Sequence, residues 1–447
     1  MKQTQELFEL NPSQEVVLLQ TKYTIFKRVI NITMSATAEK PLNYQTMLKA
    51  FNLAVARNDC TRIRFVKKKG KLLQYFLPEV KFDSLPQIAF ESPKDQENFI
   101  KAETHKAIKY KKGEVIKPFF IKTYDGKDMV LLKVCHLNFD LYGLNVFFKD
   151  LFEVYEALDL KKELPETPAS FKEVIIRDLK QKNDAEYHEK NRQFFDEYLR
   201  ARSQPYYAGL NGGNGKLDKK MDKAGKHTIK MFFVHNDTQG YMHDVPKDLS
   251  KQILDYCAQN RISPANYLFF AFNVVQAKLN GKYNLMPLEL CNCRGTMLER
   301  KSAGTKVQSL ACYTTIKPEL EYESNLKEFC ENQFLLYRHI GFSDTAFQIM
   351  SHKIYKSSLL GTFYSLCFSF IPMMVPSGVK FQIYSNGKCA LPAYVAVVYD
   401  VATGDMKIVY DCQTKLMNGE DIKRFHEKLM QTLEVAIKVP QTQIKDI

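Results

Sequence analysis

The sequence predicts an α/β protein built from two halves of similar order. In each half, amphipathic or buried helices alternate with short apolar strands, and no segment repeats at a fixed period. The 447 residues are 45% hydrophobic and include 31 Phe and 24 Tyr, which is enough apolar side chain for large packed cores. The prolines of 164–168 interrupt the pattern, so we expect one half at 1–170 and the other at 171–447.

The first half is predicted to contain two helices and three strands. Residues 129–134 are apolar at five of six positions, which is typical of a buried strand. The apolar residues of 144–155 recur at helical spacing, so a helix should follow that strand. A further helix is expected at 44–56, and two strands at 62–66 and 72–76.

The second half is predicted to begin with a charged helix and to end with an amphipathic one. Ser263 and Pro264 are the residues expected at the N-cap and first position of a buried helix. Asn418 should cap the last helix, whose apolar face comprises Ile422, Phe425, Leu429 and Leu433. The other expected elements are a helix at 170–200, a glycine-rich surface loop at 205–226, strands at 227–234, 285–293, 394–399 and 406–410, and helices at 247–259 and 265–279.

His136 and Asp140 lie four residues apart on the turn between the buried strand and its helix. Reactive side chains often occupy such turns, because a rigid scaffold holds them while the loop exposes them. Histidine suits a general base near neutral pH, since its ordinary pKa is about 6.5. Cys135 should point to the opposite face of the strand, so we do not expect a Cys–His catalytic pair.

Several motifs around this turn resemble those of the condensation domains of nonribosomal peptide synthetases, in the chloramphenicol-acetyltransferase-like superfamily. The family pattern His-His-x-x-x-Asp-Gly corresponds to residues 135–141, with Cys135 and Leu141 in place of the first His and the Gly, and Gly143 two positions late. Further matches follow in family order at 53–65, 149–155, 194–199 and 410–416. The resemblance implies two acyltransferase-like lobes in a pseudo-dimeric V, with the active-site tunnel between them.

The resemblance also implies roles for the residues of the turn. His136 would be the general base, and Asp140 would be structural, paired with Arg62. Cys135, Leu141 and Gly143 would line the site or serve the oxyanion. A Leu in place of the family Gly cannot freely adopt a positive φ, so the backbone here has less freedom to approach the substrate and stabilise an oxyanion.

By the same resemblance, the protein is expected to be an acyltransferase of secondary metabolism. It would move an acyl group from a phosphopantetheine thioester, carried by an acyl or peptidyl carrier protein or by CoA, to an amine or alcohol. No cofactor would be bound permanently. No adenylation signature or carrier attachment motif occurs, so we expect a free-standing enzyme that works in trans. The alternatives are an alcohol O-acyltransferase that uses acyl-CoA and a degenerate, non-catalytic binding protein.

Composition and charge limit the other classes of function. The formal charge is +14, with lysine clusters at 67–71, 109–112 and 219–223, which would attract an acidic partner. No nucleic-acid-binding motif accompanies this charge. The ten cysteines are scattered and lack metal-ligand spacing, so we expect buried thiols and no metal. With no membrane span and no signal peptide in view, the expected state is a cytoplasmic monomer.

Overall fold

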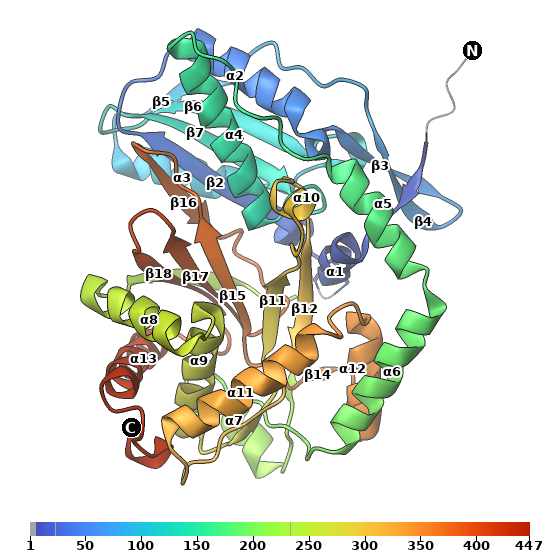
Figure 1. Cartoon of the computed structure of the whole chain (residues 1–447), viewed down its shortest axis with the longest axis vertical. Coiled ribbons are helices and arrows are strands. Elements are labelled where there is room, and N and C mark those ends of the chain that lie inside the picture. The colour runs from blue at the N-terminus through green and yellow to red at the C-terminus, as the bar shows by residue number, and fades with distance from the viewer. Residues whose placement is uncertain (1–5, 23, 233) are drawn as a thin grey trace. The chain divides into compact units, whose positions relative to one another are not determined.

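The computed structural model describes residues 6–22, 24–232 and 234–447. Contacts between residues divide the chain into two compact units, and each is described by itself (Figure 1). The first unit comprises the described residues up to Asp184 together with 292–307 and 373–386, and the second unit comprises the rest. The predicted boundary at residue 170 differs from this division, because two segments of the second half belong to the first unit.

The first unit contains a five-stranded sheet in the order β16-β2-β7-β6-β5. The central strand β7 is buried at every position and pairs antiparallel with β2 on one side and β6 on the other. At the edge of the sheet, β16 pairs antiparallel with β2, so a strand from late in the sequence completes it. The bounds are β2 Asn31–Ala38, β5 Gln87–Ala89, β6 Ile116–Lys122, β7 Asp128–Cys135 and β16 Val379–Tyr384.

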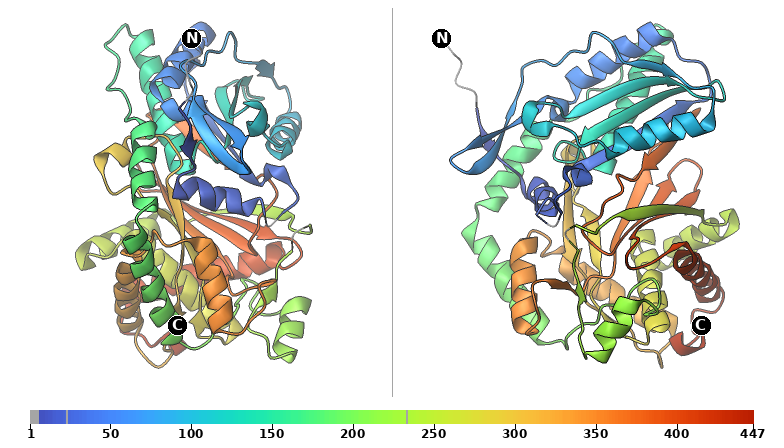
Figure 2. Two further views of the ribbon diagram at one scale, coloured as in Figure 1. Left: turned by 90° about the vertical axis from the view of Figure 1, so that its right-hand side faces the viewer. Right: turned by 180° about the vertical axis from the view of Figure 1, so that it is seen from behind.

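Helices cover both faces of this sheet, which explains the continuous burial of β7. Figure 1 shows α2 (Tyr44–Arg57) and α4 (Leu141–Asp159) together on one face, where the rings of Phe51 and Phe147 meet edge to face. Helix α3 (Pro93–His105) lies on the opposite face (Figure 2) and packs Ile100 against apolar side chains of β6 and β7.

A lysine is buried within β7. The Lys133 side chain is 2% exposed, and its Nζ donates to the carbonyl oxygens of Glu103 and Lys106 and to the Glu103 carboxylate. These carbonyls lie at the C-terminal end of α3, where helix carbonyls lack i+4 partners. A cation at this end also interacts favourably with the helix dipole. Lys133 therefore fastens α3 to the sheet, and burial lowers its pKa.

The remaining elements of the first unit surround the end of β7. A three-stranded sheet has the order β1-β4-β3, and a short helix, α10, lies within 292–307. The bounds are β1 Phe8–Glu9, α1 Pro12–Gln20, η1 Lys27–Ile30, η2 Asp59–Arg62, β3 Ile63–Lys68, β4 Lys71–Phe76, η3 Tyr110–Lys112, α5 Phe171–Lys182 and α10 Met297–Arg300.

The second unit contains a six-stranded sheet in the order β12-β11-β15-β17-β18-β9, with helices α8, α9, α11 and α13 packed together. Helix α9 is apolar on nearly all sides, and it is buried among rings of other elements. Its contacts include Phe368 of β15 and Phe425 of α13. The helices are α6 Ala185–Arg200, α7 Lys216–Lys223, α8 Lys247–Asn260, α9 Pro264–Asn280, α11 Tyr322–Tyr337, α12 Asp344–Ile354, α13 Gly419–Lys438 and η4 Ile444–Asp446. The strands are β8 Ile229–Lys230, β9 Thr238–Asp244, β10 Asn284–Leu285, β11 Leu288–Asn292, β12 Val307–Ala311, β13 Thr314–Thr315, β14 Gly361–Thr362, β15 Cys367–Met373, β17 Ala393–Asp400 and β18 Met406–Gln413.

Most of the predicted elements are confirmed, with four local corrections. The single strand expected at 285–293 is two strands, β10 and β11, which belong to different sheets. The single helix expected at 170–200 is two helices, α5 and α6, separated at 183–184. The loop expected at 205–226 contains helix α7. The strand expected at 227–234 is reduced to β8, and Phe233 lies outside the described residues. Among the described residues, no helix has the length and apolar character needed to cross a membrane.

Candidate active site

His136 begins the tight turn that joins β7 to α4, and almost every backbone carbonyl of this turn accepts a hydrogen bond. The N–H groups of Asn138 and Phe139 donate to the Cys135 carbonyl. Thr305 donates its hydroxyl to the His136 carbonyl at 2.6 Å, and Gln14 of α1 donates its amide to the Leu137 carbonyl at 2.9 Å. The turn is therefore held by side chains that are far away in the sequence.

The His136 ring is fixed through its Nδ1 atom, which lies 2.9 Å from the carbonyl oxygen of Phe139. A carbonyl oxygen only accepts, so Nδ1 must carry the proton and Nε2 is left as the unprotonated nitrogen. Burial lowers the pKa of His136 below its ordinary 6.5, while the Asp140 carboxylate opposes part of this effect. The side chain remains partly exposed, so a neutral imidazole with a basic Nε2 is the dominant form at neutral pH.

Asp140 is almost fully buried and accepts four hydrogen bonds. It is the N-cap of α4, and its Oδ1 accepts from the N–H of Gly143 at 2.6 Å. Its Oδ2 accepts from the N–H of Lys306 at 2.7 Å. Arg294 donates to both carboxylate oxygens, at 2.9 and 3.0 Å, and each side chain of this pair is 1% exposed. The aspartate thus joins the start of α4 to the segment 292–307.

The predicted partner of Asp140 was wrong. Arg62 donates instead to the backbone carbonyl of Ala56, and the bidentate partner of Asp140 is Arg294. The physical reason is that η2 turns the Arg62 side chain back toward α2, whereas Arg294 follows β11 directly into the first unit. The one signal in the sequence was the place of Arg294, directly after the strand predicted at 285–293.

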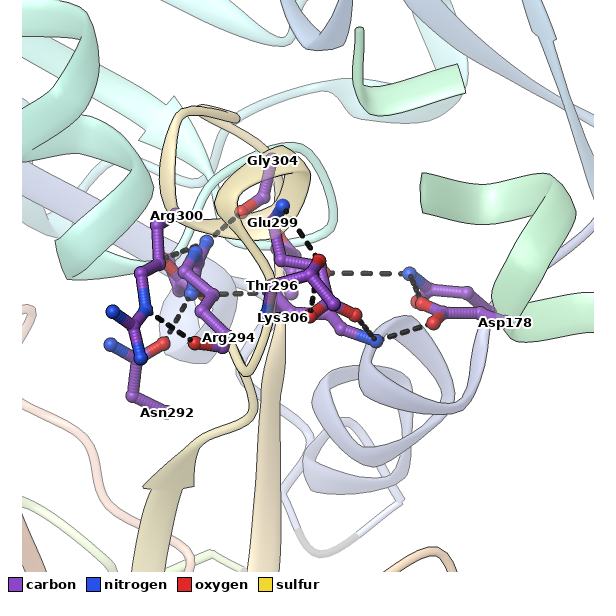
Figure 3. Close-up of polar contacts among 11 residues, drawn as sticks. Asp178, Asn292, Arg294, Thr296, Glu299, Arg300, Gly304 and Lys306 are labelled. Carbon is purple, nitrogen blue, oxygen red and sulfur yellow. Dashed lines mark hydrogen bonds and ion pairs between the residues drawn. The ribbon is translucent and has the colours of Figure 1, made fainter. Parts of the chain in front are cut away.

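The segment 292–307 carries a network of polar contacts around Arg294 (Figure 3). The guanidinium also donates to the Asn292 side chain and the Gly304 carbonyl, and it lies over the Tyr142 ring at 4.6 Å. The carbonyl of Arg294 accepts from Arg300. The planar guanidinium of arginine presents several N–H donors in a fixed arrangement, which suits it to such a buried, bidentate ion pair.

A second ion pair binds the same segment to α5. Lys306 Nζ contacts the Asp178 carboxylate and lies 3.4 Å from Glu299, which closes the capping box of α10 with Thr296 (Figure 3). Burial raises the pKa of Asp178, and Lys306 opposes that rise. Asp178 also accepts from Asn11, the N-cap of α1. None of these residues was identified from the sequence. The Thr296–Glu299 capping box is a local pattern, but the contacts of Asp178 with Lys306 and Asn11 join distant parts of the chain, and no local pattern indicates them.

Gly143 allows close contact between two backbones. A Cβ at this position would lie 2.2 Å from the carbonyl oxygen of Ala303, so a side chain here would displace the segment 292–307. The N–H of Gly143 is bonded to Asp140, and it is therefore not free for the oxyanion role expected of it. Gly143 is instead the residue that lets the segment approach α4.

Leu141 and Cys135 also differ from what the family pattern suggested. Leu141 is the first residue of α4 and has no positive φ, so this position does not require glycine. Cys135 is fully buried, and burial raises the pKa of its thiol to about 12, which rules out a reactive thiolate. All ten cysteines are free thiols, and among the described residues no three of His, Cys, Asp and Glu gather as a metal site would require.

A sequence model of the Condensation domain matches residues 4–332. One of the plipastatin synthase proteins of Bacillus subtilis (strain 168) is 20% identical over 426 residues, which cover 94% of this chain but only 16% of that protein. This chain therefore spans a small part of the curated relative's length.

Solved structures show the same fold. The starter condensation domain of rhizomide synthetase, solved with C8-CoA and Leu-SNAC, has a TM-score of 0.82 at 13% identity, over 99% of this chain and 96% of that one. The first condensation domain of the calcium-dependent antibiotic synthetase has a TM-score of 0.79 at 13% identity, over 99% and 98%. The α/β fold class expected from the sequence is confirmed, and the chain belongs to the Condensation domain family, whose members transfer acyl or peptidyl groups.

Proposed function

We propose that this protein is an active acyltransferase in which His136 is the general base. The observation that carries the proposal is the fixed tautomer of His136, with Nδ1 bonded to the Phe139 carbonyl and Nε2 left basic. An acceptor amine would give up a proton to Nε2 as its nitrogen attacks the thioester carbonyl. The new C–N bond forms, the C–S bond breaks, and the thiolate leaves and takes a proton.

The donor in this proposal is a phosphopantetheine thioester, presented by a carrier protein or by CoA, and no cofactor is bound permanently. The rhizomide synthetase domain was solved with C8-CoA and Leu-SNAC, an acyl thioester and an aminoacyl thioester, which supports a thioester donor and an amine acceptor here. An alcohol acceptor would follow the same steps and give an ester. The neutral imidazole serves either nucleophile.

The test is transfer measured with purified protein, an acyl-CoA or acyl-pantetheine donor and a panel of amines and alcohols. His136→Ala should lower kcat about 10²–10⁴-fold, which is the usual contribution of a general base. His235→Ala is the matched control, because His235 is an exposed histidine of the second unit. If His136→Ala and His235→Ala transfer at the same rate, His136 is not the base.

A non-catalytic binding protein is the second candidate, and Cys135 and Leu141 favour it, since both depart from the family pattern. Such a protein would bind an acyl thioester or carrier protein without turnover. Restoration of transfer by Cys135→His with Leu141→Gly, in a protein otherwise inactive with every thioester, would establish this second candidate.

A further inference from the structure

Thr305 connects the segment 292–307 to the backbone of His136. Its side chain is fully buried, and its hydroxyl donates to the His136 carbonyl oxygen at 2.6 Å. The N–H of the same histidine donates to the Ile30 carbonyl at 2.8 Å. Together with the bond from Nδ1 to Phe139, these contacts fix His136 at its N–H, its C=O and its ring. Thr305 supplies one of three anchors.

The backbone on both sides of Thr305 is bound by the buried ion pair. The carbonyl of Gly304 accepts from Arg294 (Figure 3), and the N–H of Lys306 donates to Asp140. The carbonyl of Thr305 itself accepts from the Asn11 side chain at 3.4 Å. The position of the Thr305 hydroxyl therefore depends on Asp140 and Arg294, which bind each other and the backbone on both sides of Thr305.

Lys306 and Asp178 hold the segment from the other side. Their ion pair is mostly buried, with side-chain exposures of 12% and 7%, and Asp178 also binds Asn11. Helix α1, which begins after Asn11, places Gln14 on the Leu137 carbonyl. One connected network thus binds two successive carbonyls of the turn: Thr305 donates to that of His136, and Gln14 donates to that of Leu137.

We propose that Thr305 is a positioning residue for the histidine, through which the Asp140–Arg294 pair sets the direction of Nε2. This inference rests on the proposed function, in which Nε2 is the base. Without the Thr305 hydroxyl the His136 carbonyl loses its hydrogen-bond donor, while the bonds of the His136 N–H and of the Leu137 carbonyl remain. The peptide between His136 and Leu137 can then tilt, which loosens the geometry in which Nδ1 meets the Phe139 carbonyl. A small misplacement of a reacting group is enough to slow a reaction about 10²-fold.

The test compares Thr305→Val, which removes the hydroxyl at nearly constant shape, with Thr305→Ser, which keeps it. Thr123→Val is the matched control: Thr123 is also a buried threonine of the first unit whose hydroxyl donates to a backbone carbonyl, but it precedes the opposite end of β7. Thr305→Val should lower kcat about 10–100-fold with little change in KM. Thr305→Ser and Thr123→Val should stay close to the parent protein.

Nitrogen NMR of histidine-labelled protein gives a readout that does not depend on transfer. The His136 signals are those missing from His136→Ala. In the parent protein they should report the Nδ1–H tautomer, and in Thr305→Val a mixture of the two tautomers. If Thr305→Val does not fold, Thr305→Ala removes the same hydroxyl and takes its place in both measurements.

The proposal is overturned if Thr305→Val matches Thr123→Val in kcat and in the His136 tautomer. It is also overturned if Thr305→Ser loses as much activity as Thr305→Val, because the hydroxyl would then be irrelevant. A failure of the proposed function looks different: His136→Ala would transfer as fast as the parent protein, while the NMR comparison would still decide whether Thr305 positions the ring.

Discussion

At the scale of single residues, His136 has one ring nitrogen committed to the backbone and one left basic. Burial lowers the pKa of its imidazole, so the neutral form persists below the ordinary value of 6.5. Because the base must be neutral, kcat should rise with pH and reach half its plateau below pH 6.5. A pH profile of transfer checks this, with the acidic limb absent in His136→Ala. A midpoint at or above pH 6.5 would contradict the assignment.

Asp140 and Arg294 form a buried ion pair, and a buried charge without its partner is costly. We expect Asp140→Asn and Arg294→Met each to lower the free energy of unfolding by about 3–5 kcal/mol. His136→Ala should change it little, since the ring makes one hydrogen bond and is partly exposed. Urea denaturation measures all three variants.

The exposed Arg192–Glu189 pair provides the matched control for this prediction, because both side chains are about half exposed. Glu189→Gln should leave the unfolding midpoint nearly unchanged, as expected of surface ion pairs. Equal losses in Asp140→Asn and Glu189→Gln would mean that the buried pair does not stabilise the fold.

Sequence reasoning identified His136 and Asp140 because they lie on a recognisable strand–turn–helix pattern. It assigned the wrong arginine, since the order of motifs along a chain does not show which side chains meet in space. Arg294 is 154 residues from Asp140, and Thr305 is 169 residues from His136. Pairings of this kind depend on where a returning segment of chain packs, and no local pattern records that.

At the scale of elements, helices with strong local signals were predicted well. In α13, Asn418 is the N-cap with a capping box, and all four predicted face residues are fully buried. The split between α5 and α6 was missed because both helices are amphipathic and no Gly or Pro separates them. Strand β16 was missed because its edge of the sheet is created by pairing with β2, which is distant in the sequence.

The β3–β4 hairpin is the element that we expect to attract an acidic carrier protein. Its base lies beside the site, because Asn138 of the His136 turn donates to the Cys60 carbonyl and weakly to that of Ile63. Near its tip, Lys67, Lys68 and Lys69 are exposed, and no carboxylate of the described residues lies within 4.0 Å of their ammonium groups. Replacing these three lysines by serine should raise KM for a carrier-bound donor and flatten its dependence on salt.

The same variant should use a small pantetheine thioester as well as the parent protein does, because that donor lacks the carrier's charge. The matched control replaces three lysines of α7 by serine, namely Lys219, Lys220 and Lys223. If both triple variants lose the same amount of carrier-dependent activity, the effect comes from net charge and not from the hairpin.

At the scale of the whole molecule, contacts divide the chain into two compact units, each with a sheet and helices. The sequence could not show that the first unit is discontinuous. A boundary read along the chain assumes that neighbours in sequence stay in one unit, which is a fair assumption only where connections are short and local. Here residues 292–307 and 373–386 supply the partner of a buried charge and an edge strand.

This discontinuity predicts how the isolated first unit behaves. A fragment ending at Asp184 lacks Arg294 and the N–H of Lys306, so Asp140 would be a buried carboxylate without a cation. It also lacks β16, which leaves β2 as an open edge. We expect this fragment to show no cooperative unfolding transition by circular dichroism in urea, whereas a mixture with the fragment 185–447 should recover one. A transition of the fragment alone, at the midpoint of the intact chain, would mean that the returning segments contribute nothing to the fold of the first unit.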